Sequence, residues 1–146
     1  MIRIRDIDHV VLRVRDLERM IAFYRDVLGC DVVWRRPDLG LVHLRAGAAL
    51  IDLVTFDGPV GGRGGAAPGQ AGRNLDHLCL RVDPFDASAI LAHLAAHGVK
   101  ADAMDERFGA EGEGASLYID DPEGNIVELK GPAVRWPDNV PRPARE

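Results

Sequence analysis

The chain has 146 residues, a net charge of -5 at neutral pH and a pI near 5.5. Its length suffices for one compact domain with a sizeable core. The acidic balance gives no electrostatic case for binding nucleic acid or an anionic membrane. Its 2 cysteines are too few for a disulfide framework. We find no signal peptide and no bilayer-spanning apolar run, so we expect a cytoplasmic protein whose partner is a small molecule.

A heptapeptide near the N-terminus recurs in the second half of the chain. Residues 8–14 read DHVVLRV and residues 76–82 read DHLCLRV, so most positions are identical. Both segments alternate as a strand does when a helix covers one of its faces. The repeat therefore predicts one module written twice, with His9 and His77 at equivalent positions on the uncovered face.

The first module, residues 5–56, continues with a helix and three strands. Asp16 can cap the helix and Gly29 can end it. The strands are expected over residues 31–36, 41–45 and 49–56, separated by turn residues. A glycine-rich linker, residues 57–74, follows this module.

The second module, residues 75–131, repeats this plan within a single domain of residues 1–131. Asp86 can cap a helix that Gly98 stops. The strands are expected over residues 99–108, 115–119 and 125–130, and the glycines of residues 108–114 favour a lid. Four prolines, including Pro143, predict an irregular tail over residues 132–146.

The last strands of the two modules correspond, and each carries a carboxylate. Asp52 and Glu128 lie in the middle of apolar strands and alternate with neighbours that face the helices. Such a carboxylate is costly to bury unless it is paired or binds a cation. For Glu128 the alternative to a cation is a salt bridge to an arginine. With His9 and His77, the two carboxylates form a ligand set that suits a divalent first-row metal. We predict one divalent ion per site, zinc, nickel, manganese or iron.

Residues 121–128 read DPEGNIVE. With the paired strand–helix–three-strand modules and a histidine on each opening strand, this motif resembles the vicinal oxygen chelate superfamily over roughly residues 5–131. That superfamily includes glyoxalase I, methylmalonyl-CoA epimerase, extradiol dioxygenases, and fosfomycin and bleomycin resistance proteins. The resemblance implies an α+β fold in which two βαβββ modules form a half-open, eight-stranded barrel around a cavity.

The same resemblance implies which residues hold the metal. Carried over by position, His9, His77 and Glu128 match the usual ligands. Asp52 occupies the place where glyoxalase I has a glutamate, but aspartate is one methylene shorter. Direct coordination, a water bridge and an empty position therefore all stay open for Asp52. We expect a homodimer, in which the ligands of one site come from one chain or from both subunits.

Three functions compete within this superfamily. We favour a metal-dependent lyase or isomerase of the glyoxalase type, in which Glu128 or Asp52 moves a proton and the metal stabilises an enediolate. An extradiol dioxygenase would use the two histidines and Glu128 as a facial triad for iron. However, its terminal motif expects a histidine before Leu117-Tyr118, and residues 108–114 contain none. A non-catalytic binding or resistance protein is the third candidate.

Further residues bear on the substrate. Arg13 and Arg81 lie four residues after the repeat histidines and are candidate clamps for a carboxylate or phosphate, or else solvated strand ends. Tyr118 is expected to contact the substrate. Cys79 is interpreted as a small apolar residue, and His43 as an ordinary surface or cavity-wall residue.

Overall fold

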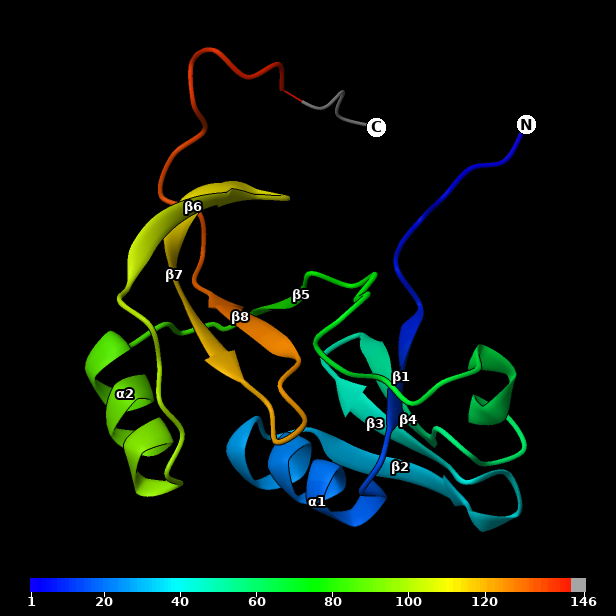
Figure 1. The fold of residues 1–146 in the computed structure, drawn as a ribbon. Coiled ribbons are helices and arrows are strands. Elements are labelled where there is room, and N and C mark those ends of the chain that lie inside the picture. Colours follow the sequence, from blue (N-terminus) through cyan, green and yellow to red (C-terminus); the bar gives the residue numbers. More distant parts are fainter. Residues whose placement is uncertain (143–146) are drawn as a thin grey trace. The chain divides into compact units, whose positions relative to one another are not determined.

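A computed structural model describes residues 1–142 of the chain (Figure 1). These residues form two compact units: residues 1–74 with 122–124, and residues 75–121 with the chain from residue 125 onward. Each unit holds one of the two predicted modules. The part of the predicted tail beyond residue 142 lies outside the described residues. No helix in residues 1–142 is long and apolar enough to cross a bilayer.

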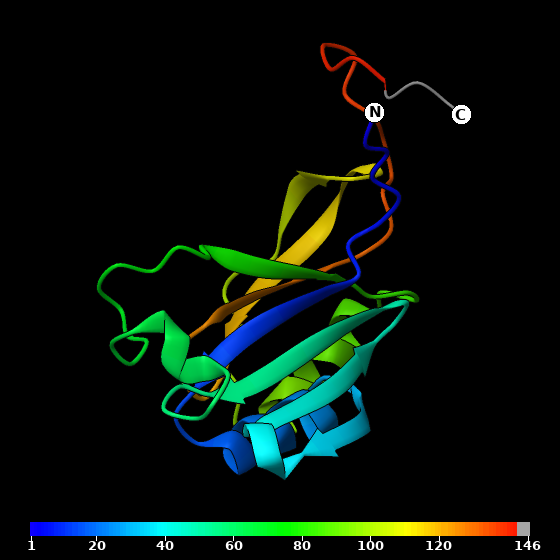
Figure 2. The same ribbon diagram turned by 90° about the vertical axis from the view of Figure 1, so that its right-hand side faces the viewer.

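The first unit contains one mixed sheet and a helical segment. Asp16 caps that segment by accepting a hydrogen bond from the backbone N–H of Arg19 at 3.0 Å. The elements are β1 (His9–Val14), α1 (Leu17–Ala22), the π-helix η1 (Phe23–Val27), β2 (Asp31–Arg36), the 3-10 helix η2 (Pro37–Leu39), β3 (Leu41–Ala46), β4 (Ala49–Thr55) and the 3-10 helix η3 (Gly61–Gly64). The strands lie in the order β1-β4-β3-β2, and β1 runs parallel to β4 (Figure 2).

The second unit repeats this topology. Its elements are β5 (His77–Arg81), α2 (Ala87–Ala96), β6 (Asp105–Gly109), β7 (Gly112–Asp120) and β8 (Ile126–Lys130). The strands lie in the order β5-β8-β7-β6, with β5 parallel to β8, which is the same arrangement as in the first sheet (Figure 1). The prediction of an α+β fold built from two βαβββ modules is therefore confirmed.

One predicted strand differs from the structure. The strand expected over residues 99–108 begins only at Asp105, and Ala101 makes an isolated bridge to Ile119. Alanine, aspartate and lysine, which dominate the preceding residues, pack poorly on a pleated surface. Residues 108–114, the expected lid, form the tip of a β-hairpin in which Phe108 pairs with Glu113, and their role as a lid stays a prediction.

Strand register decides which side chains each sheet buries. In the first unit Leu53 on β4 and Leu44 on β3 are fully buried on one face of the sheet. Helix α1 packs against β4. Asp52 pairs with Val11 on one side and His43 on the other, and so belongs to the opposite face. In the second unit Glu128 pairs with Cys79 and Tyr118, while the alternating residues Leu117, Ile119, Val127 and Leu129 are buried. The predicted alternation of faces is confirmed in both sheets.

Candidate metal and active site

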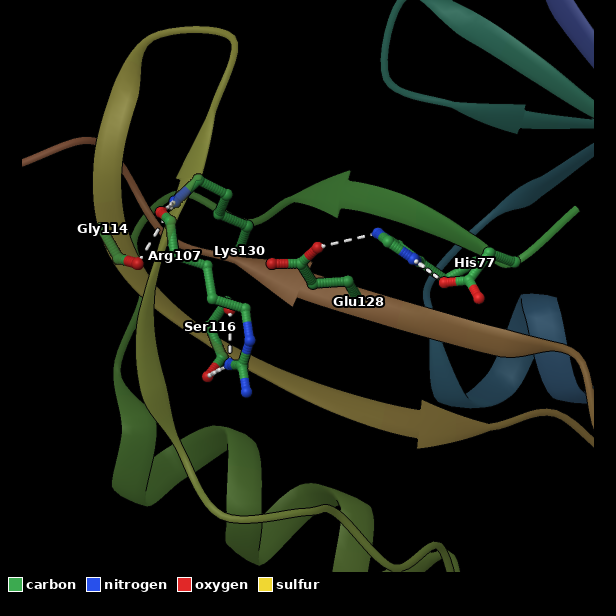
Figure 3. A network of polar contacts seen from close by, with 7 residues as sticks. His77, Arg107, Gly114, Ser116, Glu128 and Lys130 are labelled. Carbon is green, nitrogen blue, oxygen red and sulfur yellow. Dashed lines mark hydrogen bonds and ion pairs between the residues drawn. The ribbon is translucent and has the colours of Figure 1, made fainter. Parts of the chain in front are cut away.

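The clearest candidate ligand pair lies on the second sheet, where the parallel strands β5 and β8 bring His77 to Glu128. The Nε2 atom of His77 lies 3.2 Å from the Oε2 atom of Glu128 (Figure 3). Glu128 is only 5% exposed. Its other oxygen, Oε1, is buried and has no hydrogen-bond partner in the described chain. A buried polar atom left without a partner costs about 1–3 kcal/mol, and more if it is charged, so this site calls for a cation or a donor.

Both repeat histidines are oriented by the aspartate that precedes them. The Nδ1 atom of His9 lies 2.7 Å from Asp8, and that of His77 lies 2.7 Å from Asp76. An ionised carboxylate can only accept hydrogen bonds, so each Nδ1 carries a proton, and in the neutral ring Nε2 presents its lone pair. The hydrogen bond to Asp8 is also the main cause that raises the pKa of His9 above its ordinary value. Metal-binding histidines are typically held by such an outer carboxylate.

This pair fits a divalent metal on chemical grounds. With Nδ1 protonated, the lone pair of His77 faces a carboxylate oxygen, and two acceptors in contact repel unless a cation or proton lies with them. A separation of 3.2 Å suits two atoms that bind one ion, since histidine and carboxylate bind zinc at about 2.0–2.2 Å. In residues 1–142, no three His, Cys, Asp or Glu side chains gather as a metal site. The coordination of His9 and Asp52 therefore stays a prediction.

Asp52 has a protein partner that the sequence analysis missed. The buried Asp52 accepts a hydrogen bond from Nδ1 of His43, with Oδ1 at 2.8 Å. The ring of Trp34 stacks on His43 with centroids 5.8 Å apart. Residues 43 and 52 are opposed because the tight turn after Ala46 pairs Ala46 with Ala49. The spacing across this hairpin could have predicted the pairing of His43 with Asp52. The repeat could not, because it marks only residues that occur in both modules.

The predicted clamps have partners of their own. Arg13 donates hydrogen bonds to five carbonyls of residues 56–66, which ties the start of the linker to β1. Arg81 forms an ion pair with Glu111 at the tip of the β6–β7 hairpin. The role of either arginine in substrate binding stays a prediction. Nothing in the sequence marked Arg13 as a loop anchor, because backbone carbonyls have no sequence signature.

Tyr118 and Cys79 lie on either side of Glu128 in the second sheet. The ring of Tyr118 meets that of His77 edge to face, with centroids 5.4 Å apart. Burial and the charge of Glu128 raise the pKa of Tyr118, so its hydroxyl stays protonated at neutral pH. Partial burial, followed by the charge of and hydrogen bond to Glu128, raises the pKa of Cys79 to about 11. The thiol is therefore protonated and is no nucleophile at neutral pH.

A cavity of the second unit is lined by His77 but not by Glu128. Its volume is about 470 Å³, and His77, Tyr118, Lys100 and Ile126 are among the residues that line it. A volume of this size suits a small organic molecule. The predicted substrate contact of Tyr118 is consistent with this position.

Comparison with known proteins places these residues in a family context. The family model described as the Glyoxalase/Bleomycin resistance protein/Dioxygenase superfamily matches residues 6–129. The virulence protein STM3117 of Salmonella typhimurium is 33% identical over 129 residues, which are 84% of this chain and 81% of the relative. Its crystal structure has a TM-score of 0.73 at 28% identity and covers 89% of this chain and 98% of that one.

Two further similarities concern proteins with stated chemistry. The mitochondrial methylmalonyl-CoA epimerase of Mus musculus is 31% identical over 132 residues, which are 85% of this chain and 71% of the relative. A variant of the fosfomycin resistance protein FosX of Listeria monocytogenes, solved with Mn(II) and a dihydroxypropylphosphonic acid, has a TM-score of 0.67 at 19% identity. It covers 90% of this chain and 95% of that one, and it shares the fold.

Proposed function

Since the chain belongs to the Glyoxalase/Bleomycin resistance protein/Dioxygenase superfamily, we propose that it is a divalent-metal-dependent enzyme of the glyoxalase or epimerase type. The observation that carries this proposal is the contact of the half-buried His77 with the buried Glu128, one of whose carboxylate oxygens is left without a donor. The substrate is a small oxygenated compound with an acidic proton next to a carbonyl group. The similarity to methylmalonyl-CoA epimerase favours proton transfer over other reactions of the superfamily.

His77, Glu128 and His9 are the proposed metal ligands. The first two are supported by their contact, and His9 by its repeat position and its matching bond to Asp8. We assign Asp52 to holding His43 rather than to direct coordination, because its Oδ1 is already engaged. A bound divalent ion would polarise two substrate oxygens and so acidify the neighbouring C–H bond.

Two side chains are suited to move the proton. The Oε1 atom of Glu128 has no hydrogen-bond partner among the described residues and is free to accept a proton. On the first sheet, the bond to Asp52 fixes His43 with its proton on Nδ1, which leaves Nε2 to accept or return one. Glu128 in the second unit and His43 in the first are each a candidate proton carrier.

An extradiol dioxygenase is the second candidate, because two histidines and one carboxylate form the ligand set that suits non-haem iron with open positions. The β6–β7 hairpin contains no histidine that could act as its acid or base. A binding or resistance protein would hold the same compounds without turning them over. These readings differ in what happens to the substrate, so one screen separates them.

The test is exchange of the α-proton of candidate acids, thioesters and hemithioacetals in D2O, followed by NMR under nitrogen and under air. We expect oxygen-independent exchange in the metal-loaded parent. Glu128→Gln keeps a ligand oxygen but removes the base, so exchange should fall by about 10² to 10⁴-fold at matched metal occupancy. Oxygen consumption with catechols and no exchange would replace this proposal with the dioxygenase. Binding without exchange or oxygen uptake would replace it with the binding protein.

We further propose that the protein is a cytoplasmic homodimer. Both cysteines are free thiols, which fits a reducing compartment. Ile2, Ile4 and Ile7 are highly exposed near the N-terminus and are candidates for burial against a second copy. Sedimentation equilibrium of the parent and of an Ile2/Ile4/Ile7→Ser variant tests the dimer, and a monomeric parent would contradict it.

A further inference from the structure

Arg107 is a fixed cation on the face of the second sheet that carries Glu128. It lies on β6 opposite Gly114, whose side of β7 also presents Ser116 and Tyr118. Its Nη1 atom donates to the hydroxyl and the carbonyl of Ser116 at 2.9 and 3.1 Å (Figure 3). Its guanidinium carbon lies 4.6 Å from the centroid of the Tyr118 ring. Two hydrogen bonds and one stacking contact thus hold the guanidinium plane.

These contacts leave one edge of the guanidinium unused. Nη1 has two hydrogens, and both go to Ser116. Among the described residues, neither Nε nor Nη2 of Arg107 has an acceptor, and no carboxylate forms an ion pair with it. Other arginines of the same unit are neutralised: Arg81 pairs with Glu111, and Arg135 with Glu113. The Nε–Nη2 edge is a planar pair of donors that matches the two oxygens of a carboxylate or phosphonate.

The surroundings of Arg107 favour an anionic ligand. A second cation, Lys130, lies on the same face and is 5% exposed. Its ammonium group donates hydrogen bonds to the carbonyls of Arg107 and Gly114. Tyr118, which lies under the guanidinium, has a hydroxyl group that can donate a hydrogen bond as well. Tyr118 is also the cross-strand neighbour of Glu128. Tyr118 on β7 therefore lies between Arg107 on β6 and the proposed proton carrier on β8.

We propose that Arg107 is a specificity-determining residue that binds an oxyanion, a carboxylate or a phosphonate, on the substrate. This inference rests on the proposed function, because the anion belongs to the molecule whose α-proton Glu128 would move. The substrate is then an acid with two separate polar ends: two oxygens for the metal and an anionic group for Arg107. A neutral ketone or aldehyde of the same size would lack the second anchor.

If Arg107 had only a structural role, its variants would behave differently. If the guanidinium only joins β6 to β7 through Ser116 and Tyr118, its removal should lower the melting temperature and leave anion binding unchanged. Arg107→Lys separates the two roles, since it keeps the charge but loses the planar pair of donors. Arg107→Met removes both the charge and the donors. Arg25→Met is the matched control, because Arg25 is an exposed arginine of the first unit that pairs with Asp26.

The experiment titrates succinate and methylphosphonate into the purified, metal-loaded protein by calorimetry, with melting temperatures recorded for every variant. We expect at least one of the two anions to bind the parent and Arg25→Met equally. Arg107→Met should weaken that binding by about 10- to 100-fold, as for a lost charge-assisted pair of hydrogen bonds, and Arg107→Lys by less. The anion that binds more tightly identifies the oxyanion class.

Two results would overturn the inference: a folded Arg107→Met variant that binds the anion as tightly as the parent, or a parent that binds neither anion. Binding needs no turnover, so it is independent of the proton-exchange assay. Anion binding without exchange would leave Arg107 as an oxyanion site and remove the proposed reaction. Proton exchange in the parent, with anion binding unchanged in Arg107→Met, would keep the proposed reaction and remove the oxyanion site.

Discussion

The imidazole Nδ1 of His43 and the carboxylate Oδ1 of Asp52 are 2.8 Å apart on adjacent strands of the first sheet. The carboxylate is buried, whereas about a fifth of the His43 side chain is exposed, at 21%. Asp52 is therefore positioned to act through His43, as the carboxylates of catalytic dyads act through a histidine. The contact therefore favours a positioning role for Asp52, through His43, over a role as metal ligand.

We predict that Asp52→Asn and His43→Gln each slow α-proton exchange, by about 10² to 10⁴-fold for the histidine. The double variant should be hardly slower than His43→Gln alone, because the two residues act as a unit. Metal content, measured on the same samples, should stay near that of the parent. A loss of metal in Asp52→Asn as large as in His77→Ala would make Asp52 a ligand instead.

We predict that Asp76→Asn weakens metal binding by about 10- to 100-fold, because Asp76 holds the Nδ1 proton of His77. Competition against a fluorescent chelator measures this affinity. Asp102→Asn is the control, since Asp102 lines the same cavity without contacting His77. Equal affinity in the two variants would contradict the outer-carboxylate role.

We predict that Cys79 of the metal-free protein reacts slowly with iodoacetamide at pH 7.5. A pKa of about 11 instead of 9.0 lowers its thiolate fraction by about 100-fold. The rate should rise steadily with pH up to about 11. Glu128→Gln should lower this pKa and speed the reaction, because the carboxylate no longer opposes ionisation.

Cys30 is the internal control for this experiment. Burial raises its pKa to about 11 as well, with a smaller contribution from Asp31 and none from Glu128. Peptide-level mass spectrometry follows both thiols in one sample. A Glu128→Gln variant in which Cys79 is no faster, or in which Cys30 accelerates equally, would contradict the contact between Cys79 and Glu128.

We predict that Arg13→Met opens the linker between the modules. Loss of a charged donor to carbonyls costs about 1–3 kcal/mol locally, so trypsin should cut after Arg63 sooner than in the parent. Gly64→Ala should act in the same direction, because a Cβ there would lie 2.5 Å from the Arg13 guanidinium. Gly69→Ala is the control, as its Cβ would meet nothing within 4 Å. Equal cleavage rates in all four proteins would remove the anchoring role.

Much of the fold could be predicted because it is written in local patterns. The repeated DH dipeptide predicted the two modules. The alternation around Asp52 and Glu128 predicted which face of the last strands each side chain occupies, since a side chain on a strand can lie on only one of two faces. Boundaries were less predictable. The strand expected from residue 99 begins only at Asp105. Gly29 does end the first helical segment as expected, with a positive φ and its N–H on the carbonyl of Arg25, but nothing in the sequence marked the last turn, Phe23–Val27, as a π-helix.

The candidate site was only partly predictable for a physical reason. His77 and Glu128 have repeat counterparts and stand in apolar strands, so sequence alone marks them. His43 and Arg107 have no such marker, because their roles come from cross-strand neighbours, Asp52 in one case and Ser116 with Tyr118 in the other. Register brings such residues together, and it depends on turn lengths that are hard to predict.

The most direct test of the metal proposal is metal content per chain, measured by inductively coupled plasma mass spectrometry on protein purified without a chelating resin. We predict about one divalent ion per chain in the parent, as expected for the proposed ligand set. His9→Ala/His77→Ala should lose most of it while keeping its circular dichroism spectrum. His93→Ala/His97→Ala is the matched control, because these residues lie on or beside α2 and are not proposed ligands. Stoichiometric metal retained in the His9→Ala/His77→Ala protein would contradict the account.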